Sequence, residues 1–265
     1  MNPINCVQAV RKVYNAAVKN SLNEQAMPIK EYHYTVKQVA AISPHITQII
    51  LQPTFSAQLN YQAGQYIKII YPDGNASPLS IANAPTKTGL LELHLSHPQN
   101  NVQAHVTLAL LVKGKEVSLR GPYGTCTYTK ILIKRPIIFL ARGTGIAPIK
   151  AVIEELKNHK QYPVMNLYWS VTSPKEFYLH DLIKQWVQEI PNFSYTPILT
   201  RQHSAWKERV GLLQQVVLED YPDIKNTLVY ISAPESIVYE VWNAFQQVGL
   251  SKEYYYSDVF DYDPN

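Results

Sequence analysis

The chain has 265 residues, which is long enough for two domains of ordinary size. An apolar fraction of 46% and a charged fraction of 17% are typical of a folded globular chain and exclude a largely disordered one. The net charge of +4 comes without a block of lysine and arginine, so nothing favours nucleic-acid binding. No apolar run reaches transmembrane length, and Arg11 and Lys12 precede no signal-peptide core. We therefore expect a cytoplasmic protein without membrane insertion.

Cysteine and histidine usage limits the metal chemistry. The two cysteines, Cys6 and Cys126, cannot form a four-cysteine zinc or iron–sulfur site. The eight histidines show no paired ligand spacing such as HxxxH. The sequence therefore predicts no metal site.

Residues 1–30 differ from the rest of the chain. Val7, Val10, Val13, Ala17 and Leu22 recur roughly on one side of a helix. This pattern predicts an N-terminal helical extension packed on the body of the protein. A helix that docks a partner is the alternative.

Residues 31–132 consist of short β-rich runs separated by turn residues. PDG at 72–74 and TKTG at 86–89 are turn signals, and residues 102–111 form a helical pattern that Gly114 stops. Several short strands with one small helix predict an antiparallel β-barrel domain. The expected strands are YHYTVKQVA (32–40), ITQIILQP (46–53), QYIKIIY (65–71), LLELHLS (90–96) and EVSLRG (116–121).

Residues 133–265 alternate between strand and helix, which predicts an α/β domain with a parallel sheet covered on both faces. In such sheets ligands bind beyond the carboxyl ends of the strands. Those ends lie at 141–145, 170–173, 200–201 and 232–235. The expected strands are IIFLA (137–141), VMNLYWS (164–170), SYTPIL (194–199), LVYIS (228–232) and YYSDVF (255–260), with helices at 146–158, 178–189, 211–219 and 236–248.

The most informative stretch is the glycine turn after the first of these strands. Gly143, Thr144 and Gly145 separate the strand from a helix-period pattern, so backbone N–H groups and the positive end of a helix point at whatever lies there. This geometry suits a phosphate. Pro148 fits the first helical turn and stands where the ordinary dinucleotide motif has its third glycine. The alternative is an ordinary turn of an α/β domain.

Four segments in this order resemble the ferredoxin–NADP reductase superfamily, and within it the small NAD(P)H:flavin reductases without an iron–sulfur domain. SPLSIANAP (77–85) resembles the flavin segment, and RGPYG (120–124) resembles the segment that closes the barrel. ARGTGIAPIKAVIEEL (141–156) resembles the nicotinamide-nucleotide turn. YISAPESIVYEVWNAFQQVGL (230–250) with YYSDVF (255–260) resembles the terminal strand–helix–strand. Together they cover residues 31 to about 262.

The resemblance implies a flavin (FAD or FMN) held by the barrel domain, NADH or NADPH held by the α/β domain, and hydride transfer between them. It implies Ser80 and Thr144 as catalytic residues, with the Ser80 hydroxyl near flavin N5. The remaining cofactor-binding residues that it implies are Ser77, Pro78, Leu79, Ile81, His94, Leu95, Ser96, Arg142, Gly143, Gly145, Ile146, Ala147, Pro148, Arg209, Ala233 and Pro234.

The chain departs from the family pattern at several of these positions. Ser77 replaces the usual flavin arginine, Leu79 replaces a common aromatic, and Arg142 and Ala233 replace glycines. Loss of the cation at position 77 fits a weakly held flavin that is used as a substrate. The leading prediction is therefore an NAD(P)H-dependent flavin reductase acting on free flavin. The alternatives are an FAD-bound reductase that passes electrons to a separate redox protein, and a non-catalytic relative acting as a binding module.

Overall fold

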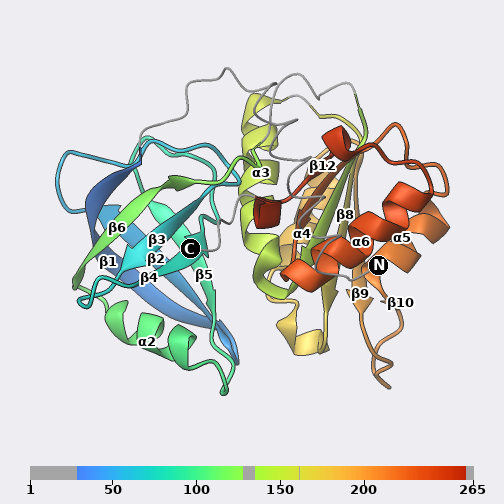
Figure 1. Ribbon diagram of the computed structural model, residues 1–265. Coiled ribbons are helices and arrows are strands. Elements are labelled where there is room, and N and C mark those ends of the chain that lie inside the picture. Colours follow the sequence, from blue (N-terminus) through green and yellow to red (C-terminus); the bar gives the residue numbers. More distant parts are fainter. Residues whose placement is uncertain (1–28, 128–134, 161, 261–265) are drawn as a thin grey trace, which may run out of the picture.

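The computed structural model of the chain describes residues 29–127, 135–160 and 162–260. These residues form two sheets of six strands each, and helix α3 (Ile146–His159) lies between the two sheets (Figure 1). The first sheet is antiparallel and the second is parallel. The expected two-domain architecture is thereby confirmed. The expected N-terminal helical extension falls almost entirely outside the described residues.

The first sheet has the strand order β4-β3-β6-β1-β2-β5. Its inner side carries one apolar core that includes Tyr34, Ile49 and Leu93, all fully buried. Short helix α2 (Val102–Leu110) covers part of this core and begins at Asn101, whose side chain accepts from the Ala104 N–H. The strands are β1 (Lys30–Ser43), β2 (Ile46–Pro53), β3 (Tyr66–Ile70), β4 (Ala76–Ser80), β5 (Leu91–Ser96) and β6 (Glu116–Tyr123).

The two outer strands of this sheet meet at one end. Ile81, directly after β4, pairs with Leu93 of β5 in a single antiparallel bridge. Ala82 N also donates to Glu92 O at 2.7 Å. The sheet therefore curls so that its two outer strands meet just after β4, at Ile81 and Ala82 of the SPLSIANAP segment.

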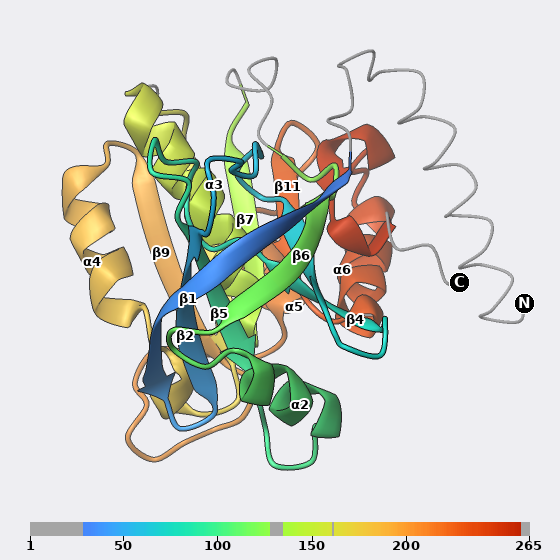
Figure 2. The ribbon, with the colours of Figure 1, turned by 90° about the vertical axis from the view of Figure 1, so that its left-hand side faces the viewer.

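The second sheet has the strand order β10-β9-β8-β7-β11-β12, with β7 inside it. Residues of β7 alternate between two cores: Ile137 and Phe139 face α3 and α4 (His180–Glu189), and Ile138 and Leu140 face the other helices. In Figure 2 helices α4 and α6 flank opposite sides of this sheet. The remaining elements are β7 (Ile137–Arg142), β8 (Met165–Val171), β9 (Phe193–Leu199), β10 (Arg209–Val210), β11 (Leu228–Ser232), β12 (Tyr255–Tyr256), α5 (Leu213–Asp220) and α6 (Glu235–Gln247).

The last expected strand is wrong beyond its second residue. After Tyr256 the chain turns, because Phe260 N donates to Ser257 O at 3.2 Å and closes a short 3₁₀ turn. Strand β4 was not among the strands predicted from the sequence. Pro78 lies within it, and proline is tolerated there because β4 is an outer strand of the sheet. Within the described ranges, no helix is long and apolar enough to cross a membrane.

Candidate functional site

The two sheets share a cleft of about 400 Å³ that residues of both line. The antiparallel sheet contributes strand β4 and the end of strand β5, and the parallel sheet contributes the loops after β7 and β11. These loops follow the carboxyl ends of parallel strands, where ligands of such sheets bind. The predicted residues that line the cleft are Ser77, Pro78, Leu79, Ser80, His94, Leu95, Ser96, Arg142, Thr144, Gly145, Ala147, Ala233 and Pro234.

Five predicted residues lie elsewhere. Ile81 and Ile146 are fully buried in the two cores, and Pro148 lines a smaller cavity of about 110 Å³ together with Ser80 and Ala233. Arg209 forms ion pairs with Glu219 and Asp220 of α5 and does not line the cleft. Gly143 lies in the turn itself, where its carbonyl accepts from Trp169 Nε1 at 2.9 Å.

The two glycines of the turn are required for different reasons. Gly143 has a φ of +55°, and a Cβ at this position would meet no heavy atom within 4 Å. A Cβ on Gly145 would lie 1.9 Å from the backbone oxygen of Ser232. Gly145 therefore permits the turn to pack against the end of β11. Gly145 is also one of the predicted cofactor-binding residues, and this contact is a structural reason for glycine at that position.

Arg142 places an incompletely bonded cation in the cleft. Its Nη2 donates to Thr172 Oγ1 at 2.9 Å, while Nη1 is buried and has no hydrogen-bond partner among the described residues. Burial lowers the pKa of this guanidinium, and the charge of Glu176 acts in the opposite direction. A buried, unsatisfied donor on a charged group is costly, so an anion in the cleft would be stabilised here.

Four further cleft residues were not among the predicted cofactor-binding residues. Asn101, Gln103 and Ala104 come from the start of α2, and Ser232 ends β11. The helix α2 was predicted, but its packing beside β5 depends on the folded sheet. Ser232 lies in the strand end at 232–235, where the sequence predicted that ligands bind.

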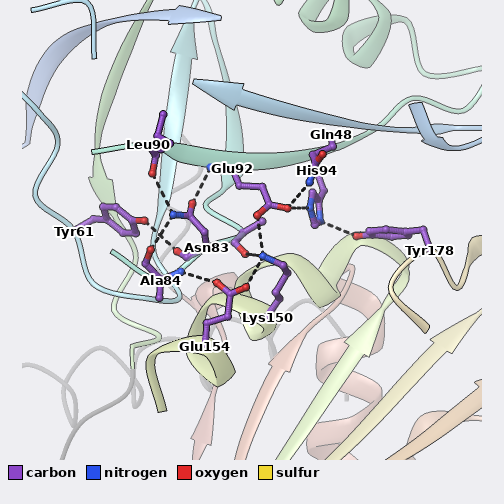
Figure 3. Close-up of polar contacts among 11 residues, drawn as sticks. Gln48, Tyr61, Asn83, Ala84, Leu90, Glu92, His94, Lys150, Glu154 and Tyr178 are labelled. Carbon is purple, nitrogen blue, oxygen red and sulfur yellow. Dashed lines mark hydrogen bonds and ion pairs between the residues drawn. The ribbon is translucent and has the colours of Figure 1, made fainter. Parts of the chain in front are cut away.

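A buried polar network joins the two sheets beside the cleft (Figure 3). Lys150 Nζ donates to Glu92 Oε2 at 2.8 Å, to Glu154 Oε1 at 2.8 Å and to Ala82 O at 2.9 Å. The Lys150 side chain is only 6% exposed and the Glu92 side chain 14%. All three ammonium donors are thus satisfied, as a buried lysine requires.

The network continues from Glu92 toward the cleft. Glu92 Oε1 accepts from Gln48 Nε2 at 2.7 Å and from His94 Nε2 at 2.8 Å, and His94 Nδ1 lies 3.0 Å from the Tyr178 hydroxyl. Burial raises the pKa of Glu92, but the His94 hydrogen bond and the charge of Lys150 outweigh it and lower the pKa to about 2. Glu92 is therefore ionised, and Nε2 of His94 carries the donated proton.

Comparisons with known proteins agree with this arrangement. Residues 139–241 match the family described as Oxidoreductase NAD-binding domain. The CDP-6-deoxy-L-threo-D-glycero-4-hexulose-3-dehydrase reductase of Yersinia pestis is 32% identical over 231 residues, which are 87% of this chain and 69% of that protein. A probable flavin reductase of Photobacterium leiognathi is 26% identical over 87% of this chain and 99% of its own length.

The fold is also found among solved structures. The crystal structure of the Amycolatopsis cytochrome P450 reductase GcoB superposes with a TM-score of 0.79 at 24% identity, covering 88% of this chain and 70% of that one. A likeness at this identity concerns the fold alone. Together with the sequence relatives, the paired sheets and the shared cleft, it completes the assignment: the chain belongs to the ferredoxin–NADP reductase superfamily, among its flavin-reductase-like members.

Proposed function

We propose that the protein is an NAD(P)H-dependent flavin oxidoreductase that reduces free FMN, FAD or riboflavin. The observation that carries this proposal is the shared cleft, in which the flavin-segment residues Ser77–Ser80 and the nucleotide-turn residues Arg142, Thr144 and Gly145 face one cavity. A hydride can pass directly between two bound rings only where both partners reach the same space. The printed name of the Photobacterium relative, a probable flavin reductase, supports the same activity.

The cleft residues fit an anionic nucleotide. Arg142 offers a buried Nη1 donor, Gly143 leaves open space on its Cα, and the turn leads into the N-terminus of a 14-residue helix. All three features favour a phosphate group near the nucleotide turn. On the other wall Ser77 carries no charge, so the flavin side lacks a cation at this position. We therefore expect the nicotinamide nucleotide to be anchored by charge and the flavin to be held more weakly.

When bound, the nicotinamide supplies a hydride and the flavin accepts it at N5. Ser80 lines both the cleft and the smaller cavity beside it, so its hydroxyl can serve as a donor or an acceptor next to the reacting ring. Thr144 lines the opposite wall from the turn. We assign these two side chains to orienting the reacting partners.

The second candidate is a reductase that keeps FAD bound and passes electrons to a separate redox protein. The specific observation in its favour is the Yersinia relative, which is named as the reductase of a dehydrase and is the more similar of the two relatives described. The same cleft would serve both activities. The cytoplasmic location and the domain limits 31–132 and 133–265 also remain proposals.

One spectrophotometric experiment tests the proposal. The purified protein is scanned for flavin absorbance, and NADH and NADPH oxidation are then followed with and without added FMN, FAD or riboflavin. The proposed function predicts a colourless protein whose oxidation of NADH or NADPH depends on added flavin. A yellow protein with stoichiometric FAD favours the second candidate. A colourless and inert protein contradicts both and leaves the non-catalytic alternative.

A further inference from the structure

Lys150 joins three of the segments that line the cleft. It belongs to α3, one turn after the Gly143–Ala147 segment that forms the nucleotide side. Its acceptor Ala82 O lies two residues after Ser80, and its acceptor Glu92 lies two residues before His94. The flavin segment, the wall of β5 and the nucleotide helix therefore converge on one ammonium group (Figure 3).

The same helix makes a second contact with the flavin segment one turn later. Glu154 Oε2 accepts from the Ala84 N–H at 3.0 Å, while Glu154 Oε1 is held by Lys150. Asn83, between these two contacts, bonds back to β5, because its Oδ1 accepts from Glu92 N at 2.7 Å. Residues 82–84 are thus fixed to both α3 and β5 directly behind Ser80.

We propose that Lys150 is a positioning residue, which sets the separation between the flavin-side and nucleotide-side walls of the cleft. This inference rests on the proposed function. Each wall keeps its own ligand contacts without Lys150, because Lys150 does not line the cleft. Loss of Lys150 should therefore change the distance between two bound rings more than it changes the affinity for either. A misplacement of about 1 Å can cost on the order of a hundredfold in rate.

The central test compares Lys150→Met with the wild type in single-turnover reduction of added FMN by NADH at saturation. We expect the rate to fall by about ten- to a hundredfold, while the dissociation constants of NADH and FMN change by less than about threefold, or under 1 kcal/mol. With NADH deuterated at C4, the isotope effect should become more temperature-dependent, because the donor–acceptor distance is less tightly held. Lys157→Met is the matched control, since Lys157 of the same helix forms an ion pair with Glu189 on the exposed surface. A wild-type rate in Lys150→Met overturns the proposal.

Stability is separated from positioning by a second variant. Lys150→Met alone leaves ionised Glu92 without its buried cation, so a loss of stability is expected. The double variant Glu92→Gln with Lys150→Met removes both charges and should melt closer to the wild type than the single variant does. If Lys150 positions the walls, the double variant stays slow. Recovery of the rate together with the melting temperature would mean that the pair only stabilises the fold.

Hydrogen exchange supplies a readout that needs no turnover. In the ligand-free protein, the amides of residues 82–84 should exchange faster in Lys150→Met than in the wild type, and Lys157→Met should leave them unchanged. If the wild type itself reduces no flavin, the proposed function fails. Amide hydrogen exchange at residues 82–84 still tests whether Lys150 couples the two walls of the cleft. Unchanged exchange at residues 82–84 overturns the inference whatever the activity.

Discussion

The guanidinium of Arg142, a residue that lines the cleft, donates to Thr172 Oγ1 at 2.9 Å through Nη2, and its Nη1 is buried without a partner among the described residues. Thr172 therefore orients a cation whose second donor group has no hydrogen bond within the described part of the chain. The family usually has glycine at this cofactor-binding position, so the side chain of Arg142 has no counterpart in the family pattern. The same cleft contains Ser77, where the family usually has an arginine. Compared with the family pattern, this chain therefore lacks the cation at position 77 on the flavin wall and has one at position 142 on the nucleotide wall.

Arg142→Gln should weaken nucleotide binding by about tenfold, because one charge-assisted hydrogen bond contributes roughly 1.5 kcal/mol. The measurement is a titration with NADH and, separately, with nicotinamide mononucleotide in reduced form. Arg120→Gln is a matched control, since Arg120 pairs with Glu31 on the exposed surface of the first domain. If Arg142 binds flavin phosphate instead, the variant will lose affinity for FMN and keep its affinity for riboflavin and NADH.

Ser77→Arg tests the other wall of the cleft. Restoring a cation at the flavin segment should tighten FMN binding by about tenfold, again on the scale of roughly 1.5 kcal/mol for a charge-assisted bond. Riboflavin, which lacks the phosphate, should gain much less. Equilibrium dialysis with both flavins measures the difference. A wild type that purifies with stoichiometric flavin would contradict the premise that the flavin is weakly held.

Ser80→Ala should lower the hydride-transfer rate by roughly ten- to a thousandfold, which is the range for losing one positioned polar group. Flavin affinity should change much less, since other groups of the segment also contact the cleft. Single-turnover reduction of FMN by saturating NADH gives the rate. Ser118→Ala is the control, because Ser118 lies on β6 and contacts His33 on the surface. A wild-type rate in Ser80→Ala would remove this hydroxyl from the mechanism.

The two turn glycines should respond differently to alanine. Gly145→Ala places a Cβ 1.9 Å from Ser232 O, so we expect a clear fall in melting temperature. Gly143→Ala meets open space, and its φ of +55° costs only about 1 kcal/mol for a non-glycine residue. The Cβ of Gly143→Ala would lie at the nucleotide turn. We therefore expect this variant to lose NADH affinity while its melting temperature falls only slightly. Thermal melts and NADH titrations of both variants distinguish the two roles, and equal losses of affinity would contradict the distinction.

The sequence predicted the residues that line the cleft better than the buried contacts that join its two walls. Short motifs such as SPLSIANAP and ARGTGIAP carry their residue types within a few positions, so the sequence predicts residues on both walls of the cleft. Lys150 lies within the nucleotide segment 141–156, but nothing in the local pattern distinguishes this one polar residue of a mostly buried helix. Its partner Glu92 alternates with leucines in a strand and gives the pattern of an ordinary surface carboxylate. Their pairing is a tertiary contact over 58 positions, and no local pattern encodes it.

Glu92 should make the stability of the protein depend on pH in the acid range. Its pKa is about 2 in the folded protein against 4.5 as the ordinary value. A carboxyl group with a lowered folded pKa contributes stability that is complete above its unfolded pKa and is lost as the pH falls toward the folded pKa. The difference corresponds to about 3 kcal/mol. The wild type should therefore lose stability between about pH 5 and pH 2, and Glu92→Gln should lose less over that interval.

Urea unfolding at intervals from pH 7 to pH 2.5 measures this difference, with Glu116→Gln as a control on the half-exposed surface. Parallel pH curves for the wild type and Glu92→Gln would show that Glu92 is not held ionised by Lys150 and His94.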